Sequence, residues 1–281
     1  LIATPESGQL LFPWGVVALD RARDLIATPS ARGYNSSSGR GLIETAMKEN
    51  LVSTGLTGAR PVEHKLNIQT VRHGKLTWVN VERPTRDEIE WLRQNFAFHP
   101  LHLDDCLSKI QRPKIDEHEG YLFIVLHFPV FNKMERVTVA SEVDIFIGPD
   151  YFVTSHAGDL KPLRRLFQEC QNTPARRQEL MSRSTGFLLY QVVDRLVDYC
   201  FPILDKIDDN IEAVEDIIFE QTARQTVQDI SVIRRDVINF RRIIKPQIPV
   251  IASLAHKERP FLQEDLEAYF SDIADHVAKI W

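Results

Sequence analysis

The chain has 281 residues, of which 43% are hydrophobic and 26% charged, and its formal net charge is −5. This composition is that of an ordinary globular protein, and its acidic balance argues against a general nucleic-acid binder, which needs a basic face. Three widely spaced cysteines, Cys106, Cys170 and Cys200, fit neither a disulfide framework nor a zinc finger.

Residues 1–61 carry little periodic signal, and we treat them as an N-terminal segment. Residues 30–41 (SARGYNSSSGRG) have the composition of a mobile linker, and the pentapeptide LIATP, which occurs twice, is too short to establish a repeat. Leucine stands at position 1 and a helical pattern still runs at Trp281, so we expect the chain to be part of a longer protein.

Residues 62–178 predict an α/β/α sandwich. Alternating apolar residues on both sides of His73 and Gly74 predict a hairpin. Thr85 and Glu88 form a capping box that should open a helix, and Pro100 should begin a shorter helix that reaches Leu107.

Three strands are predicted next, at Tyr121–Phe131, Val137–Ile147 and Tyr151–Ser155. The first is almost continuously apolar, as expected of a strand buried on both faces. The sequence Gly-Pro-Asp at 148–150 predicts a tight turn that pairs the last two strands antiparallel. An amphipathic helix at 160–171 completes the sandwich.

Residues 179–281 predict long helices. Apolar residues three or four apart from Thr185 to Glu220 predict one helix of roughly ten turns, about 50 Å long, in which Pro202 should force a kink. Its acidic second half should turn near Gln221 and pair with a basic returning helix, with an apolar seam holding the two together. Pro246 and Pro249 should kink or end the return. A last helix with an apolar seam should begin near Pro260.

Three groups of acidic residues could bind a cation. They are Asp104 with Asp105, Asp272 with Asp275 and His276, and Asp194 with Asp198. Carboxylates suit Mg²⁺, and an imidazole suits Co²⁺ or Ni²⁺. Taken alone, the first two groups are explained more simply as solvated helix faces, and Arg195 could equally form a structural salt bridge within the third. The sequence has no nucleophile elbow, glycine-rich phosphate loop or zinc-protease motif.

Three stretches resemble the CorA-type magnesium and cobalt transporters. They are FHPLHLDDCLSKIQRPKIDEHEGYLFIVLHF (Phe98–Phe128), LLYQVVDRLVDYCFPILDKIDDNIEAVED (Leu188–Asp216) and AYFSDIADHVAKI (Ala268–Ile280). The resemblance covers about Leu76 to Trp281. The block Gln-Arg-Pro-Lys together with Lys-Ile-Asp-Asp at this spacing is specific to the family, whereas neither block is specific alone.

The resemblance implies an α+β fold, in which the sandwich is followed by a long helical hairpin and the start of a stalk helix. It also implies the cytosolic domain of a homopentameric divalent-cation channel. That domain lies at the cytoplasmic face of the cell inner membrane and is anchored by C-terminal spans absent from this sequence. No catalytic role and no nucleic-acid partner are expected.

The resemblance also implies two regulatory Mg²⁺ sites. Asp105 of one subunit and Asp272 of its neighbour match the family's primary site. Asp104, Asp194 and His276 match a second site close by. A cation at such an interface should offset the repulsion between carboxylates and favour the closed, symmetric assembly.

Three alternatives stay open. A ZntB-like zinc transporter shares the fold and should prefer Zn²⁺. A helical interaction scaffold without a metal role should present the acidic segment Asp205–Glu220 to a partner. An enzyme with Cys106 as nucleophile, beside His99 and His102 in the sequence, has the least support.

Overall fold

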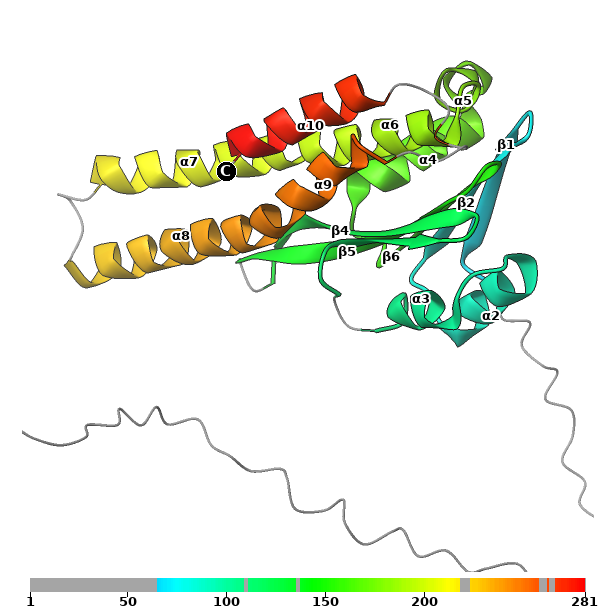
Figure 1. The fold of residues 1–281 in the computed structure, drawn as a ribbon. Coiled ribbons are helices and arrows are strands. Elements are labelled where there is room, and N and C mark those ends of the chain that lie inside the picture. Colours follow the sequence, from blue (N-terminus) through cyan, green and yellow to red (C-terminus); the bar gives the residue numbers. More distant parts are fainter. Residues whose placement is uncertain are drawn as a thin grey trace, which may run out of the picture. The chain divides into compact units, whose positions relative to one another are not determined.

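A six-stranded mixed sheet is the centre of the fold (Figure 1). The computed structural model describes residues 65–108, 111–134, 137–217, 223–257, 262 and 266–280. The expected linker, the repeated pentapeptide and the whole segment 1–61 lie outside these residues. The strands are β1 (Ile68–His73), β2 (Leu76–Glu82), β3 (Lys114–His118), β4 (Tyr121–Asn132), β5 (Val137–Ile147) and β6 (Tyr151–His156).

The strand order is β1-β2-β6-β5-β4-β3, with β2 and β6 parallel and every other pair antiparallel. The predicted hairpin is confirmed as β1–β2, whose turn places Gly74 at a φ of +56°, where a side chain would be strained. The predicted β5–β6 pairing is also confirmed. Strand β3 was not predicted.

Strand β4 is buried on both faces over its first ten residues, as its apolar run predicted. Because successive side chains alternate between faces, Leu122 and Ile124 enter one core, whereas Tyr121 and Phe123 enter the other. The strand therefore joins the two halves of the sandwich.

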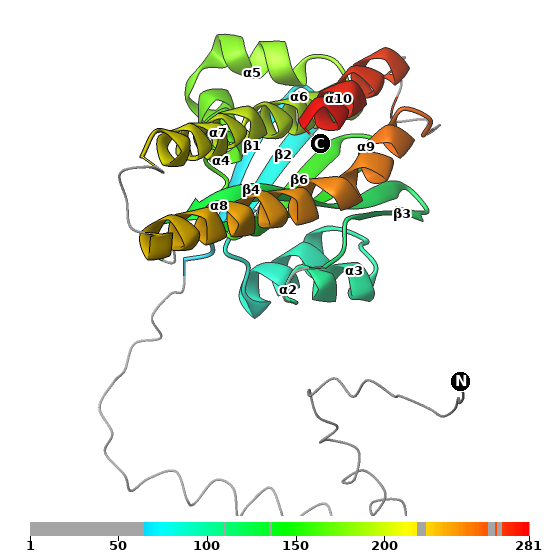
Figure 2. The same cartoon turned by 90° about the vertical axis from the view of Figure 1, so that its left-hand side faces the viewer.

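Helices cover both faces of the sheet (Figures 1 and 2). One face carries α2 (Arg86–Asn95) and α3 (Pro100–Asp105). The other carries α4 (Lys161–Asn172), α5 (Pro174–Met181), α6 (Thr185–Asp198), α7 (Cys200–Ile217), α8 (Ala223–Ile244), a 3₁₀ turn η1 (Lys245–Gln247), α9 (Ile248–Leu254) and α10 (Glu267–Ile280). The expected α+β fold with an α/β/α sandwich is confirmed. Among the described residues no helix is both long and apolar enough to span a bilayer.

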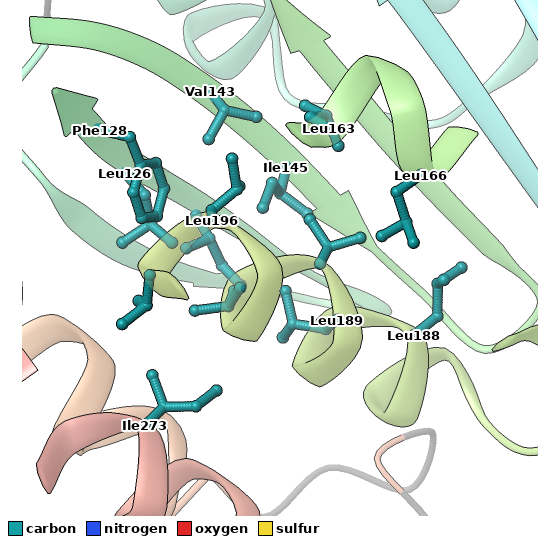
Figure 3. Close-up of a cluster of buried hydrophobic side chains, with 14 of the residues drawn as sticks. Leu126, Phe128, Val143, Ile145, Leu163, Leu166, Leu188, Leu189, Leu196 and Ile273 are labelled. Atoms are coloured by element: carbon teal, nitrogen blue, oxygen red, sulfur yellow. The ribbon is translucent and has the colours of Figure 1, made fainter. Parts of the chain in front are cut away.

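Helix α6 packs between the sheet and α10 (Figure 3). Its Leu188, Leu189 and Leu196 are fully buried. They pack in one cluster with Ile145 of β5, and Ile273 of α10 joins the same cluster. Helix α10 is therefore held against α6 by its predicted apolar seam, to which the buried Phe270 also belongs.

The single ten-turn helix predicted from Thr185 is wrong. The structure has two helices, α6 and α7, separated by a turn at Tyr199. Pro202 explains the break, because it has no N–H to bond the carbonyl of Asp198 and its ring crowds that turn. The kink predicted at Pro202 is thus confirmed, and the distortion is large enough to end α6 at Asp198. Likewise α8 ends at Ile244, just before Pro246, and continues only as η1 and α9.

Polar side chains of the α8–η1 segment bond to strand backbone where β4 and β5 extend past their neighbours. The β3–β4 register ends at Val125, and the β5–β6 register begins at Val143. Beyond these points, the Gln247 amide donates to the carbonyl of His127 and accepts from its N–H at 2.7 Å. Asp236 accepts from the N–H of Thr138 at 3.0 Å, and Asn239 donates to its carbonyl at 3.2 Å.

The capping box at the start of α2 is confirmed. The Thr85 hydroxyl accepts from the N–H of Asp87 at 3.3 Å, and Glu88 accepts from the N–H of Thr85 at 2.8 Å. Replacing Thr85 by alanine should lower the free energy of unfolding by about 1 kcal/mol, because the first turn loses its cap. Urea denaturation measures this loss. Thr173→Ala is the matched control, since Thr173 precedes α5 without a side-chain cap bond. Equal losses in the two variants would contradict the assignment.

Candidate metal centre

Carboxylates and an imidazole converge where α6 packs against α10. Asp194 and Asp198 lie one turn apart on α6, and His276 reaches them from α10. One ligand atom of each residue lies within 4.8 Å of the other two. Asp272, one turn before His276, places its Oδ1 3.7 Å from Nε2 of that imidazole. We call Asp194, Asp198, Asp272 and His276 the α6–α10 cluster.

The α6–α10 cluster has an uncompensated negative charge. Partial burial and then the neighbouring charge of Asp198 raise the pKa of Asp194, while His276 opposes this. The Nδ1 atom of His276 is buried and has no hydrogen-bond partner. Asp194 is partly buried, whereas Asp198 and Asp272 are exposed. Neighbouring carboxylates with an unsatisfied ring nitrogen are a donor set that a divalent cation satisfies.

Arg195 does not neutralise this cluster. Within the part of the chain that the structure describes, no ion pair joins Arg195 to Asp194 or Asp198. Its charge only lowers the pKa of Asp194, as the smallest of the influences on that group. Arg195 is exposed and lines a small cavity with α4 residues and Tyr199. The structural salt bridge considered for this pair is therefore not formed.

The other two predicted ligands lie on the opposite side of the sheet (Figures 1 and 2). Asp104 and Asp105 are on α3, whose neighbours belong to the second core. Asp104 is exposed, and the Asp105 carboxylate accepts a hydrogen bond from Lys114 Nζ at 2.8 Å. Within one chain these carboxylates cannot share an ion with Asp194, Asp272 or His276. A shared site needs a second copy of the chain.

The sequence grouped Asp198 with Asp194 as a candidate cation site, because residues four apart share a helix face. The resemblance implied only Asp194 from this helix, so Asp198 is not among the five residues that it gave as ligands. The structure places both carboxylates in the cluster.

Cys106 does not resemble an activated nucleophile. Its side chain is 7% exposed, and burial followed by the nearby Asp144 raises the pKa of its thiol well above the ordinary value. A reactive cysteine has the opposite property, a lowered pKa in an accessible site.

Comparison with known proteins finds relatives with similar sequences. A sequence model of the family described as "CorA-like Mg2+ transporter protein" matches residues 73–281. The putative metal ion transporter YfjQ of Bacillus subtilis is 30% identical over 229 residues, which are 81% of this chain and 69% of that protein. The cobalt/magnesium transport protein CorA of Thermotoga maritima is 30% identical over 208 residues, 73% of this chain and 58% of that protein.

Solved structures share the fold. The complete CorA magnesium transporter from Methanocaldococcus jannaschii aligns with a TM-score of 0.64 at 20% identity, over 73% of this chain and 63% of that one. The ZntB cytoplasmic domain from Vibrio parahaemolyticus aligns with a TM-score of 0.58 at 17% identity, over 73% of this chain and 79% of that one. These likenesses concern the fold alone, and they include a zinc transport branch.

Proposed function

This chain belongs to the family of CorA-like Mg²⁺ transporter proteins, and on that premise we propose that it is the cation-sensing cytosolic part of a divalent-cation transporter. Mg²⁺ is the proposed regulatory ligand, and Mg²⁺ and Co²⁺ are the proposed cargo of the whole transporter. The proposed whole protein is a homopentamer anchored in the cell inner membrane by further segments. The observation that carries the proposal is the α6–α10 cluster, with its repelling carboxylates and unpartnered imidazole nitrogen.

The two helices of the cluster belong to one packed unit, so a cation between them would affect stability. Ile273 and Val277 fasten α10 to the core, and Asp272 and His276 lie on the adjoining polar face. A cation that bridges the α6 and α10 side chains offsets their repulsion and holds the two helices together. We propose that sensing reaches the membrane through α10, because its sequence resembles the start of the family's stalk helix.

Asp104 and Asp105 support a second, intermolecular role. Lys114 holds Asp105 and also Asp116, whose Oδ2 lies 2.7 Å from Lys114 Nζ. We propose that Asp105 meets Asp272 of a neighbouring copy, and that Mg²⁺ competes there with the Lys114 ammonium. In the monomer, Mg²⁺ then acts mainly on the α6–α10 cluster. In the assembled protein it also acts between subunits.

About 10 mM Mg²⁺ should raise the melting temperature of the isolated chain by about 3 °C. A weak carboxylate site of ~1 mM affinity gains about 1.4 kcal/mol at that concentration. Asp194→Asn should abolish most of this shift, and Asp272→Asn should reduce it. Differential scanning calorimetry with and without Mg²⁺ measures both.

The matched control is Asp275→Asn, which makes the same charge change at an exposed position of α10 outside the α6–α10 cluster. It should leave the Mg²⁺ shift intact. If Mg²⁺ raised the melting temperature of Asp194→Asn and Asp275→Asn by the same amount, the α6–α10 cluster would not be the Mg²⁺ site. Sedimentation velocity of the same samples tests the assembly, since Asp105→Asn should weaken only a Mg²⁺-dependent increase in oligomer size.

The likeness to ZntB supports a zinc transporter as the second candidate. Calorimetric titration of one sample with Mg²⁺ and with Zn²⁺ separates the two. A magnesium sensor should bind Mg²⁺ at about 1 mM, whereas a zinc sensor should show no Mg²⁺ binding there and should bind Zn²⁺ through Asp194 and His276. Tighter binding of Zn²⁺ alone does not decide, because imidazole-containing sites favour Zn²⁺ over Mg²⁺ in general. A scaffold without a metal role would be unaffected by either ion and by chelators.

A further inference from the structure

Three histidines gather at the junction of α3 and β3, far from the α6–α10 cluster. His99 and His102 lie at the start of α3, and His118 ends β3. Their ring centroids are 5.5 Å (His99–His102), 5.8 Å (His99–His118) and 6.3 Å (His102–His118) apart. Nothing in the proposed Mg²⁺ function uses these rings.

The sequence of β3 directs its polar residues toward α3. Alternate residues of a strand share a face, so Lys114, Asp116 and His118 lie together. Contacts confirm that this face meets α3, because Lys114 pairs with Asp105 and the Asp116 Oδ2 lies 3.6 Å from His102 Nε2. Two imidazoles and a carboxylate thus approach one another from two elements.

Each of these two imidazoles has its second nitrogen held by a hydrogen bond. His118 Nδ1 lies 3.2 Å from the carbonyl of Glu119 and must donate to it, which leaves a lone pair on Nε2. His102 Nδ1 lies 2.8 Å from the hydroxyl of Tyr121, which accepts from the N–H of His99 and, in the proposed site, would also accept from Nδ1–H of His102. An imidazole anchored through one nitrogen is the arrangement that metal-ligating histidines adopt.

His99 is in a different state. Its Nδ1 accepts from the N–H of Leu101 at 3.2 Å and so caps α3, which puts the ring proton of neutral His99 on Nε2. This ring is therefore a neighbour of the site and not one of its ligands.

The imidazole of His102 is held in a fixed orientation. Its side chain is 12% exposed, and its ring stacks on Phe123 at a centroid distance of 4.6 Å. A ring whose orientation is already fixed loses little further conformational freedom when it binds a metal.

The site is open in this structure. Zinc binds histidine nitrogen at about 2.0–2.1 Å, so two ring centroids on one tetrahedral ion are about 5 Å apart. The His102 and His118 centroids are 6.3 Å apart, and among the described residues only Asp194, Asp198 and His276 have ligand atoms that all lie within 4.8 Å of one another. His118, at the end of the edge strand β3, therefore has to move toward His102 by about 1 Å or more when a metal binds.

We propose that His102 Nε2, His118 Nε2 and the Asp116 carboxylate form a second cation site, which takes a borderline transition-metal ion such as Zn²⁺ or Co²⁺ in preference to Mg²⁺. Two imidazoles favour these ions, whereas Mg²⁺ prefers oxygen. Binding also draws Asp116 away from Lys114, which leaves that ammonium to Asp105 alone. The site does not depend on the proposed Mg²⁺ function.

The test is a titration of the full chain with Co²⁺, followed by the visible absorption of the bound ion, in a His276→Ala background that removes the α6–α10 imidazole. Binding should persist in that background and weaken at least about tenfold when His118→Ala or His102→Ala is added. Tyr121→Phe, which removes the partner of His102 Nδ1, should weaken binding by a similar factor. His256→Ala is the control, since His256 is exposed.

Circular dichroism establishes that each variant is folded. His118→Thr provides a second test at the strand position if the alanine variant unfolds, because threonine favours strands. Undiminished Co²⁺ absorption in folded His118 and His102 variants would overturn the proposal, as would absence of binding in the His276→Ala background. Absence of a Mg²⁺ response would contradict the proposed function but not this second cation site.

Discussion

Replacing Gln247 by alanine should destabilise the protein by about 3 kcal/mol or more, a large part of the total stability of a domain. Gln247 is 1% exposed, and its amide pairs with both backbone groups of His127 in β4. Alanine leaves these two buried groups without partners, each at a cost of about 1–3 kcal/mol, and opens a cavity. The free energy of unfolding in urea measures the loss.

Two further variants separate the contributions. Gln247→Met keeps the volume of the side chain but not its hydrogen bonds. It should therefore lower the free energy of unfolding almost as much as Gln247→Ala does. Gln94→Ala is the control, because Gln94 is exposed and bonds only to Glu90 one turn away. A Gln247→Ala variant within 1 kcal/mol of that control would show that the strand backbone finds other partners.

Acid should destabilise the protein through His156 by about 3 kcal/mol between pH 6.5 and pH 4. His156 is 3% exposed, donates from Nε2 to Asn80 Oδ1 at 3.0 Å and accepts at Nδ1 from the N–H of Gly158 at 3.0 Å. The second bond requires the neutral ring, because a protonated Nδ1 cannot accept. Burial lowers the pKa of His156 from 6.5 to about 4, although Asp159 opposes this.

The sign follows from linkage. Above pH 6.5 the ring is neutral in both states and this contribution to stability is complete. As the pH falls toward 4, only the unfolded chain takes up the proton, so stability is lost at about 1.4 kcal/mol per pH unit. Below the folded-state pKa the loss is constant. The raised pKa of Asp194 acts in the opposite direction. The folded protein binds a proton at this carboxyl more tightly than the unfolded chain does, so the folded state becomes more stable as the pH falls.

Urea denaturation at pH 7.5, 5.5 and 4.5 measures this dependence, and comparison with a variant isolates the contribution of His156. His156→Gln should flatten the pH profile over this range, whereas His256→Gln, at an exposed position, should reproduce the wild-type slope. A slope that survives in His156→Gln would assign the acid sensitivity to other groups.

Elements encoded by neighbouring residues were predictable. The turn at Gly74, the capping box of Thr85 and the apolar run of β4 depend on local chemistry, and each is confirmed. The end of α6 before Pro202 was also foreseeable, although the helical periodicity on both sides of the proline favoured one long helix. Strand β3 was missed because its five residues, KIDEH, are mostly charged and lie at the sheet edge.

The candidate site was only partly predictable. Asp194 and His276 are 82 positions apart, and only the packing of α10 on α6 brings them together. Likewise, no local pattern indicates that Gln247 bonds to β4, because this depends on how far each strand extends past its neighbour. The proposed link between Asp105 and Asp272 involves a second copy of the chain, which no single-chain fold can bring together.

The helix side chains on the projecting ends of β4 and β5 also bear on aggregation. A strand recruits another strand through unpaired backbone N–H and C=O groups, and projecting ribbons are where such templating starts. Here the groups at His127 and Thr138 are bonded intramolecularly. Growth of a cross-β polymer from this ribbon therefore first requires α8 and η1 to detach. Strand-to-strand templating at these positions is therefore disfavoured for as long as each copy keeps its helices in place.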